Sequence, residues 1–154
     1  MRKNKQINAL FQIDSLSRLN LETDSSLDII KEGLKLGVNV WITDPKDLTF
    51  YAGRISSTAY KFKNLSLKLY KPKKIFLENF DFFFIRQDPP FDMNYISNCY
   101  LLELHKNFNK KPFFINDPTG IKNFTEKIFP LYFQRLMPKT AVSWSVEALK
   151  FMFK

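Results

Sequence analysis

The chain has 154 residues and carries 24 Lys and Arg against 15 Asp and Glu, so its formal net charge is +9. A chain of this length can fold as one domain without disulfides or a structural metal. Its single cysteine, Cys99, excludes an intramolecular disulfide and a paired-cysteine zinc site, which favours a reducing compartment. No stretch approaches the roughly 18 consecutive apolar residues that span a bilayer, and the apolar run at residues 9–11 is too short for a secretory signal. We therefore expect a cytoplasmic protein with no membrane partner.

The positive charge raises the question of nucleic-acid binding, because counterion release from phosphates drives that interaction. Only five of the 24 basic residues are arginine, although arginine is better suited to bidentate recognition of phosphates and bases. The chain is rich in Lys, Asn, Ile and Phe and has only four glycines, a bias expected of AT-rich codons. The composition thus favours a solvated, lysine-rich surface over a nucleic-acid-binding stripe.

The first part of the chain predicts a βαβ unit. A short apolar run at residues 9–13 is typical of a buried strand. Asp24 can cap a helix over residues 25–36, and Gly37 supplies the left-handed residue that ends it. Residues 38–43 follow as a second strand. This order of elements implies parallel pairing and a right-handed crossover.

A hairpin and an exposed connection are expected next. Residues 48–51 and 54–63 flank an Ala-Gly pair, which is the pattern of a β-hairpin. Six lysines within residues 61–74 indicate a connection exposed to solvent.

The middle of the chain contains the strongest strand pattern, the run Phe-Asp-Phe-Phe-Phe-Ile at residues 80–85, which we place at the centre of the sheet. Residues 94–108 predict a helix. Cys99 falls on its apolar side as a small core residue, and His105, the only histidine, falls on its polar side as a surface residue. Residues 112–115 predict a further strand, with proline at the first position, where it is tolerated.

The last part of the chain predicts a helix that begins at a cap on Asn123 or Thr125 and runs through Phe133. A strand over residues 140–143 and a final helix capped by Ser145 follow. Since strands and helices alternate throughout, the class is α/β with a mainly parallel sheet and a β-hairpin excursion.

Several motifs are absent from the sequence. No GxGxxG follows the first strand and no GxxxxGK[ST] occurs, which excludes a dinucleotide fingerprint and a P-loop. With one histidine and no serine or cysteine placed by a nucleophile motif, a catalytic triad is not expected. We predict no catalytic residue and no metal ligand in this chain.

Three polar segments follow predicted strands, at residues 14–26, 86–92 and 116–120. In open α/β sheets, ligands bind outside the carboxyl ends of the parallel strands, where such loops converge. The first segment ends in Asp-Ser-Ser at a helix N-terminus, which presents free backbone amides to an anion.

The second segment, Arg-Gln-Asp-Pro-Pro-Phe-Asp, is the most informative. Arg86 offers a planar fork suited to a carboxylate, and two prolines fix the backbone beyond it. Asp88 and Asp92 can hold the arginine or meet a substrate amine, so the loop suits an amino-acid-like ligand that carries both charges. In the alternative interpretation the prolines end a strand, Asp92 caps the next helix and Arg86 pairs structurally with Asp88.

At these residues the chain resembles the amino-terminal domain of prokaryotic glutathione synthetase, which carries Asp-Pro-Pro-Phe-Asp after an arginine and, usually, a lysine. The similarity rests also on Asp-Ser-Ser at residues 24–26, on Gly37, and on Asp-Leu at residues 47–48. Further segments, at residues 116–118 and 126–129, resemble the family's Asn-Lys-Pro and Asn-Glu-Lys-Leu-Phe. The departures are Gln87 for the lysine, Ile13-Asp14-Ser15 for Met-Asp-Pro, Asp117 for the lysine of Asn-Lys-Pro, and Thr125 for the asparagine before Glu-Lys.

The resemblance covers nearly the whole chain from about residue 9. It implies a three-layer, Rossmann-like pre-ATP-grasp fold with helices on both faces of the sheet. Residues 1–8 would be a basic extension, residues 9–139 the substrate-binding domain, and residues 140–154 the start of the connection to an ATP-grasp domain. The implied substrate-binding residues are Arg86 as carboxylate anchor, Asp88 and Asp92 orienting it, and Asp24, Ser25 and Asn116 lining the crevice. Lys127 matches a nucleotide contact of the family.

By the same resemblance, the complete enzyme uses ATP and Mg²⁺ to join γ-glutamylcysteine and glycine through an acyl phosphate. The ATP-grasp portion supplies most of the phosphate and metal contacts, so we expect no cofactor in this chain and a truncated or split form that is inactive alone. The expected partners are γ-glutamylcysteine or glutathione, a separate ATP-grasp chain, and further copies in a homo-oligomer. Two alternatives are a non-catalytic module that binds a small peptide or protein, and a basic nucleic-acid binder.

Overall fold

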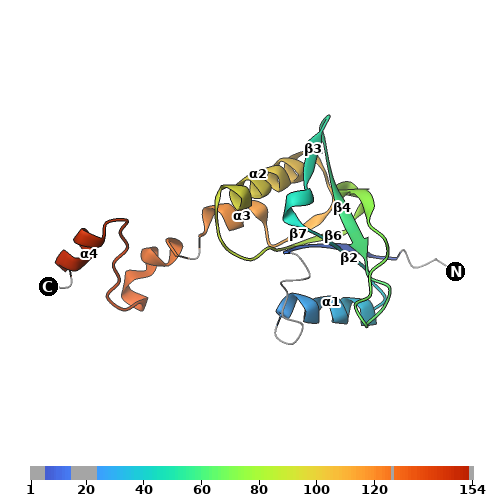
Figure 1. Cartoon of the computed structure of the whole chain (residues 1–154). Helices are drawn as coiled ribbons and strands as arrows, with labels where there is room; N and C mark the ends of the chain where they lie inside the picture. Colours follow the sequence, from blue (N-terminus) through green and yellow to red (C-terminus); the bar gives the residue numbers. More distant parts are fainter. Residues whose placement is uncertain (1–5, 15–23, 126, 153–154) are drawn as a thin grey trace. The chain divides into compact units, whose positions relative to one another are not determined.

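The computed structural model describes residues 6–14, 24–125 and 127–152 (Figure 1). The chain forms two compact units, Met1–Lys122 and Asn123–Lys154. The predicted features that lie outside the described residues are most of the predicted basic extension, residues 15–23 of the first polar segment, Glu126, and the last two residues of the chain. The domain limits implied by the resemblance stay a prediction.

In the described residues the first unit is built on one seven-stranded sheet with the order β3-β4-β2-β1-β6-β7 and β5 paired to β4. The strands β1, β2, β6 and β7 run parallel, and β3 to β5 add antiparallel pairs on the β2 side. Their bounds are β1 Asn8–Ile13, β2 Asn39–Thr43, β3 Thr49–Tyr51, β4 Arg54–Lys61, β5 Lys73–Phe76, β6 Phe82–Arg86 and β7 Phe113–Ile115. The predicted α/β class is confirmed. The prediction that the aromatic strand lies at the centre of the sheet is wrong, because β6 lies next to the edge strand β7 and β1 and β2 are more central.

Two helices cover the two faces of this sheet, α1 (Ser25–Lys35) and α2 (Met93–Phe108) (Figure 1). Side chains alternate along β1, so Phe11 packs in a cluster with Leu27 of α1, whereas Leu10 packs in a second cluster with Leu102 of α2. The unit therefore has the predicted three layers, with one apolar core on each side of the sheet.

Local rules account for the helix ends. The Asp24 carboxylate accepts a hydrogen bond from the Ser26 amide at 2.7 Å and so caps α1 as predicted. Gly37 follows the helix at φ +78°, a conformation that glycine adopts without steric cost. Asp92 caps α2 by accepting from the Tyr95 amide at 2.9 Å.

The predicted hairpin is also confirmed. Tyr51 pairs with Arg54, and Ala52 and Gly53 both have positive φ, as a two-residue type I′ turn requires. The single-turn 3-10 helices η2 (Pro45–Asp47) and η3 (Leu77–Asn79) lie on either side of the hairpin in the chain.

The connection at residues 61–74 is more ordered than its composition indicated. Phe62 is buried and forms a β-bridge with Leu69, so the lysine-rich segment turns back on itself before entering β5. Lysines that surround a single buried phenylalanine therefore occupy a folded segment, which the charge pattern alone did not reveal.

The helix predicted to begin near residue 123 is placed differently. A short helix α3 (Pro118–Asn123) precedes it, and the boundary between the two units falls after Lys122, at the last residue of that helix. In the second unit, the 3-10 helix η4 (Phe129–Leu136) contains Pro130 in its first turn, and α4 (Val146–Met152) begins where the Ser145 hydroxyl accepts from the Ala148 amide. The strand predicted over residues 140–143 is wrong, because no strand of the described second unit offers it a partner.

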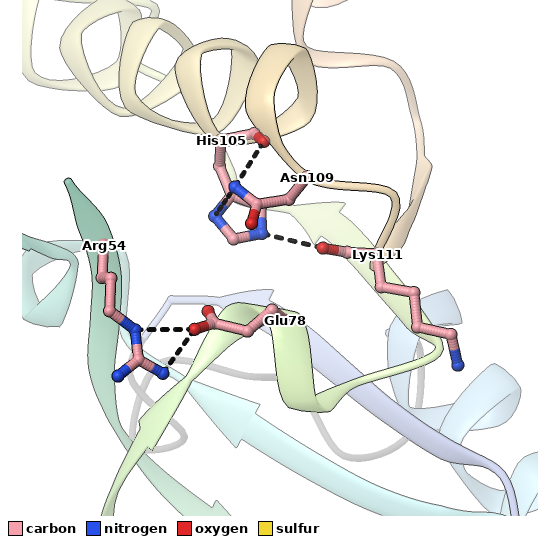
Figure 2. Close-up of polar contacts among 5 residues, drawn as sticks. All are labelled: Arg54, Glu78, His105, Asn109 and Lys111. Atoms are coloured by element: carbon pink, nitrogen blue, oxygen red, sulfur yellow. Dashed lines mark hydrogen bonds and ion pairs between the residues drawn. The ribbon is translucent and has the colours of Figure 1, made fainter.

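The prediction that His105 lies on the surface is wrong, since only 3% of the residue is exposed. Its Nε2 donates to the Lys111 carbonyl at 2.9 Å, and the Asn109 side-chain amide donates to its Nδ1 at 3.4 Å (Figure 2). These contacts assign a neutral imidazole with the proton on Nε2. The chain after α2 folds back over the ring, so a helix position that looked polar by periodicity became an interior one.

A second polar contact lies near this histidine (Figure 2). Arg54 on β4 donates through Nε and Nη2 to one oxygen of Glu78, at 2.8 and 2.5 Å.

No helix in the described part of the chain is long and apolar enough to cross a membrane.

Replacing His105 with alanine should lower the free energy of unfolding by about 2 kcal/mol, because the buried ring and its hydrogen bonds to the Lys111 carbonyl and the Asn109 side-chain amide are lost. Urea denaturation measures this change. The matched control is Lys110→Ala at an exposed position of the following loop, for which a change within about 0.5 kcal/mol is expected. Equal costs for the two variants would contradict the structural role of His105.

Candidate functional site

The carboxyl ends of the parallel strands meet at one edge of the sheet. Ile13 of β1 lies beside Arg86 of β6, and Gln12 lies beside Thr43 of β2. The residues that follow these strands therefore leave the sheet together, at the edge where ligands bind in folds of this class.

Arg86 joins the end of β6 to the start of α1. Its Nε donates to the Ser26 hydroxyl at 3.0 Å, and its Nη2 donates to the Ser25 hydroxyl at 2.8 Å. In the described residues it forms no ion pair with a carboxylate, including those of Asp88 and Asp92. Neutral hydroxyls thus fix the position of the guanidinium without compensating its charge.

The N-terminus of α1 adds to this positive locus. Asp24 uses its carboxylate to cap the helix, and Ser25 and Ser26 occupy the first turn, where backbone N–H groups point outward. The positive end of the α1 dipole and the Arg86 guanidinium therefore lie next to each other, an arrangement that favours binding of an anionic group. The structure brings Asp24, Ser25 and Arg86 together at this edge, and their role in binding a substrate stays a prediction.

A hollow of about 720 Å³ opens beside the loop that follows β6. Its walls carry four carboxylates, of which Asp44 pairs with Lys46 at 3.2 Å. The other lining residues are prolines and polar side chains. The complete lining is Asp14, Asp44, Pro45, Lys46, Gln87, Asp88, Pro89, Pro90, Asp92, Asn94, Ser97 and Asn98.

Asp88 and Asp92 belong to the wall of this hollow. The Asp88 amide donates to the Asp14 carboxylate at 2.6 Å, which ties the loop after β6 to the end of β1. Asp92 caps α2, as the alternative interpretation of this segment in the sequence analysis predicted. Their contacts in the described residues place them beside the hollow rather than on the guanidinium of Arg86. Their role in orienting a substrate stays a prediction.

Gln12 and Gln87 form a contact that sequence reasoning missed. Gln12 is fully buried at the end of β1, and its Nε2 donates to the Gln87 side-chain oxygen at 3.1 Å. The sequence signal that could have indicated this contact is Gln12, a polar residue between Phe11 and Ile13. Asp44 and Lys46 were missed as well, although an Asp-Pro pair directly after a parallel strand marks the same edge of the sheet.

Tyr95 closes the loop from the α2 side. Its hydroxyl donates to the Gln87 carbonyl at 3.4 Å. Burial raises the pKa of Tyr95 to about 12, and the nearby Cys99, Asp14 and Asp88 add to the effect. The phenol therefore stays protonated at neutral pH and acts as a hydrogen-bond donor.

Asn116 follows β7, whose last residue, Ile115, lies beside Phe84 of β6, so Asn116 lies at the same edge of the sheet. The next residue, Asp117, accepts from the amides of Thr119 and Gly120 and begins α3. Hydrogen bonding from Lys106 holds the pKa of the Asp117 carboxyl below its usual range. Asp117 therefore has a structural role at the position where the family resemblance implies a lysine.

Lys127 is exposed and belongs to the second unit, so its role as a nucleotide contact stays a prediction. Within the described ranges, no group of three or more His, Cys, Asp or Glu side chains could hold a metal ion. The four aspartates of the hollow therefore do not form a metal-ligand set.

Comparison with known proteins gives a consistent result. Residues 7–122 match the family model described as prokaryotic glutathione synthetase, N-terminal domain. Similar relatives named glutathione synthetase include those of Agrobacterium fabrum, 33% identical over 147 residues, and of Brucella melitensis biotype 1, 34% identical over 137 residues. These alignments cover 92% and 86% of this chain but 45% and 43% of the relatives. The chain spans slightly less than half the length of the curated relatives it matches.

Cys99, one turn after Tyr95 on α2, should be unreactive in the folded protein. Burial raises the pKa of its thiol to about 11, so only about a thousandth of it is thiolate at pH 8. We expect Ellman's reagent to label the native chain at least about a hundredfold more slowly than the urea-unfolded chain, which should yield one thiol per molecule. Equal rates would show that this face of α2 is open to solvent.

Proposed function

The chain belongs to the family of prokaryotic glutathione synthetase N-terminal domains, and on that premise we propose that it forms the wall of the peptide-substrate site and binds γ-glutamylcysteine. The observation that carries the proposal is the guanidinium of Arg86, which two serine hydroxyls hold at the carboxyl edge of the sheet.

The geometry of Arg86 suits recognition of a carboxylate. The serines occupy two of its N–H groups, and the remaining N–H groups keep the fixed directions of the planar fork. Because the side chain is already positioned by Ser25 and Ser26, less conformational entropy is lost when a ligand binds. In our proposal, Arg86 pairs with a carboxylate of the peptide, next to the N-terminus of α1.

The acidic hollow suits the opposite charge. γ-Glutamylcysteine carries one ammonium group as well as its carboxylates, and the aspartates of the hollow outnumber its single lysine. The loop after Arg86 lines the hollow, whereas Arg86 itself does not. The substrate would then bind across this loop, with Asp88 and Asp92 facing its ammonium group and Asn116 contributing an amide.

The phosphoryl-transfer groups belong to another part of the enzyme in this proposal. Mg·ATP does not fit the residues described, which hold no metal-ligand cluster, and the sequence has no glycine-rich phosphate loop. The relatives are more than twice as long as their aligned part, which leaves room for an ATP-grasp portion.

The exposed apolar side chains of the second unit support the proposal that another part of the enzyme performs phosphoryl transfer. Large apolar side chains on it are exposed, including Trp144 at 96%, together with Tyr132, Leu136 and Phe151. Large apolar side chains exposed in this number are typical of a surface that another protein segment covers. We propose that the unit provides the surface on which an ATP-grasp portion packs, carried by the same longer protein or by a separate chain.

Calorimetry tests the proposed binding directly. Titration of γ-glutamylcysteine into the 154-residue chain should give a saturable heat, and Arg86→Ala should weaken the affinity by about tenfold or more, since a charge-assisted pair is lost. Arg86→Lys should lie between the two, because lysine keeps the charge but not the fork.

The matched control is Arg135→Ala, an exposed arginine of the second unit, which should leave the affinity within about twofold. Thermal melting of each variant separates lost binding from lost folding. Equal affinities for the wild-type chain and Arg86→Ala would overturn the role of Arg86, and an absence of heat from the wild type would overturn substrate binding by this chain.

Activity assays test the proposal that this chain binds the peptide and that a separate part of the enzyme performs phosphoryl transfer. The chain alone should not form glutathione from γ-glutamylcysteine, glycine and ATP, whereas mixing it with the carboxyl-terminal half of the Agrobacterium fabrum relative should restore turnover. Arg86→Ala should reduce the restored rate. Turnover by the 154 residues alone would contradict the assignment of phosphoryl transfer to another part.

A further inference from the structure

The lysine-rich segment, which the proposed function does not use, folds as a second hairpin. The Lys63 amide donates to the Lys68 carbonyl at 2.7 Å, and the Tyr70 amide donates to the Lys61 carbonyl at 2.8 Å. Between these bonds, Phe62 and Leu69 form a β-bridge. The segment therefore has a defined antiparallel register.

This register sorts the side chains onto two faces. Phe62 is buried in the core beside α1, and Leu69 packs against the same cluster. Because side chains alternate along a strand and cross-strand neighbours share a face, the opposite face collects Lys61, Lys63 and Lys68 with Tyr70. Burial of one apolar face thus forces the lysines together on the other.

The charge on this face is uncompensated. Residues 61–77 contain no aspartate or glutamate, and in the part of the chain that the structure describes none of the six lysines at 61–74 pairs with a carboxylate. Lys63 and Lys68 lie at directly opposed positions, an arrangement that destabilises a β-pair. The Lys63 ammonium lies 5.1 Å from the centre of the Tyr70 ring. An anionic ligand would relieve the repulsion that the register imposes.

Two hollows flank the exposed ring of Tyr70. One, of about 520 Å³, is lined by lysines together with polar side chains that include Gln6, Asn39 and Asn64. The other, of about 490 Å³, is lined by Trp41, Lys61, Tyr70, Lys71 and Lys73. Lys61 and Tyr70 line both hollows, so the two hollows adjoin each other and share cationic and aromatic groups.

This surface lies away from the substrate crevice. Asn39, in the wall of the first hollow, pairs with Asn8 at the amino end of β1, whereas Arg86 pairs with Ile13 at its carboxyl end. The two surfaces therefore occupy opposite edges of the parallel strands and cannot be parts of one small-molecule site.

We propose that the basic hairpin face, defined as Lys61, Lys63, Lys68, Tyr70, Lys71 and Lys73 with the neighbouring Trp41, binds single-stranded nucleic acid. Lysine ammonium groups track the phosphates, and the rings of Tyr70 and Trp41 offer platforms for unstacked bases. A duplex would keep its bases stacked and away from these rings, and an acidic peptide segment lacks the bases that match them. With no arginine on the face, binding is tolerant of sequence.

Fluorescence anisotropy with a labelled oligo(dT) of about twelve nucleotides tests the proposal. If about four lysines contact phosphates, the plot of log affinity against log salt should have a slope of about −3. The double variant Lys63→Gln/Lys68→Gln should lower the affinity about tenfold or more at low salt and make the slope shallower by about 1.4. Tyr70→Ala should lower the affinity about fivefold or more through lost stacking.

The matched control is Lys139→Gln/Lys150→Gln, which removes the same charge from exposed positions of the second unit and should change the affinity less than about twofold. Arg86→Ala should also leave oligonucleotide binding unchanged, so failure of the substrate site is distinguishable from failure of this one. No binding at low salt, equal losses in the two double variants, or equal or tighter binding of a duplex or a polyglutamate peptide would each overturn the proposal.

Discussion

The parallel pairing of β1 with β2 on one side and with β6 on the other is the constraint on which the first unit depends. It brings three carboxyl ends to one edge, so the loops after these strands must share that edge. The apolar side chains of β1 alternate between two cores, one closed by α1 and one by α2. Near the carboxyl end of the strand Gln12 contacts Gln87, and just after it the Asp14 carboxylate accepts from the Asp88 amide.

Positive and negative groups stay apart at this edge of the sheet because two of the carboxylates already accept hydrogen bonds from backbone amides. Asp24 and Asp92 are engaged as helix caps, so they neutralise helix ends rather than the guanidinium of Arg86. The arginine is held instead by two neutral hydroxyls and keeps its full charge beside the positive end of α1. The loop that follows this arginine lines an acidic hollow. We propose that a ligand with both charges contacts the two regions at once.

Features set by neighbouring residues were predictable from the sequence, whereas features set by distant ones were not. The cap at Asp24 and the stop at Gly37 depend on local backbone geometry, and both were confirmed. His105 was mispredicted because its burial depends on a loop that folds back after the helix. The position of Arg86 at a strand end followed from the pattern, but its serine partners depend on the packing of α1 against the sheet. The strand expected at residues 140–143 had β-like composition but no neighbour to pair with.

The central claim is that Arg86, held by the serines of α1, receives a carboxylate of γ-glutamylcysteine. The most direct measurement is the ¹H–¹⁵N spectrum of the arginine Nε–H groups and backbone amides during addition of the peptide. The account predicts that the signals of Arg86 Nε–H, Ser25 and Ser26 shift together to saturation, while the Nε–H signal of Arg54, bound to Glu78, stays in place. Unchanged Arg86 and serine signals at saturating peptide, or shifts confined to Arg54 and its neighbours, would contradict it.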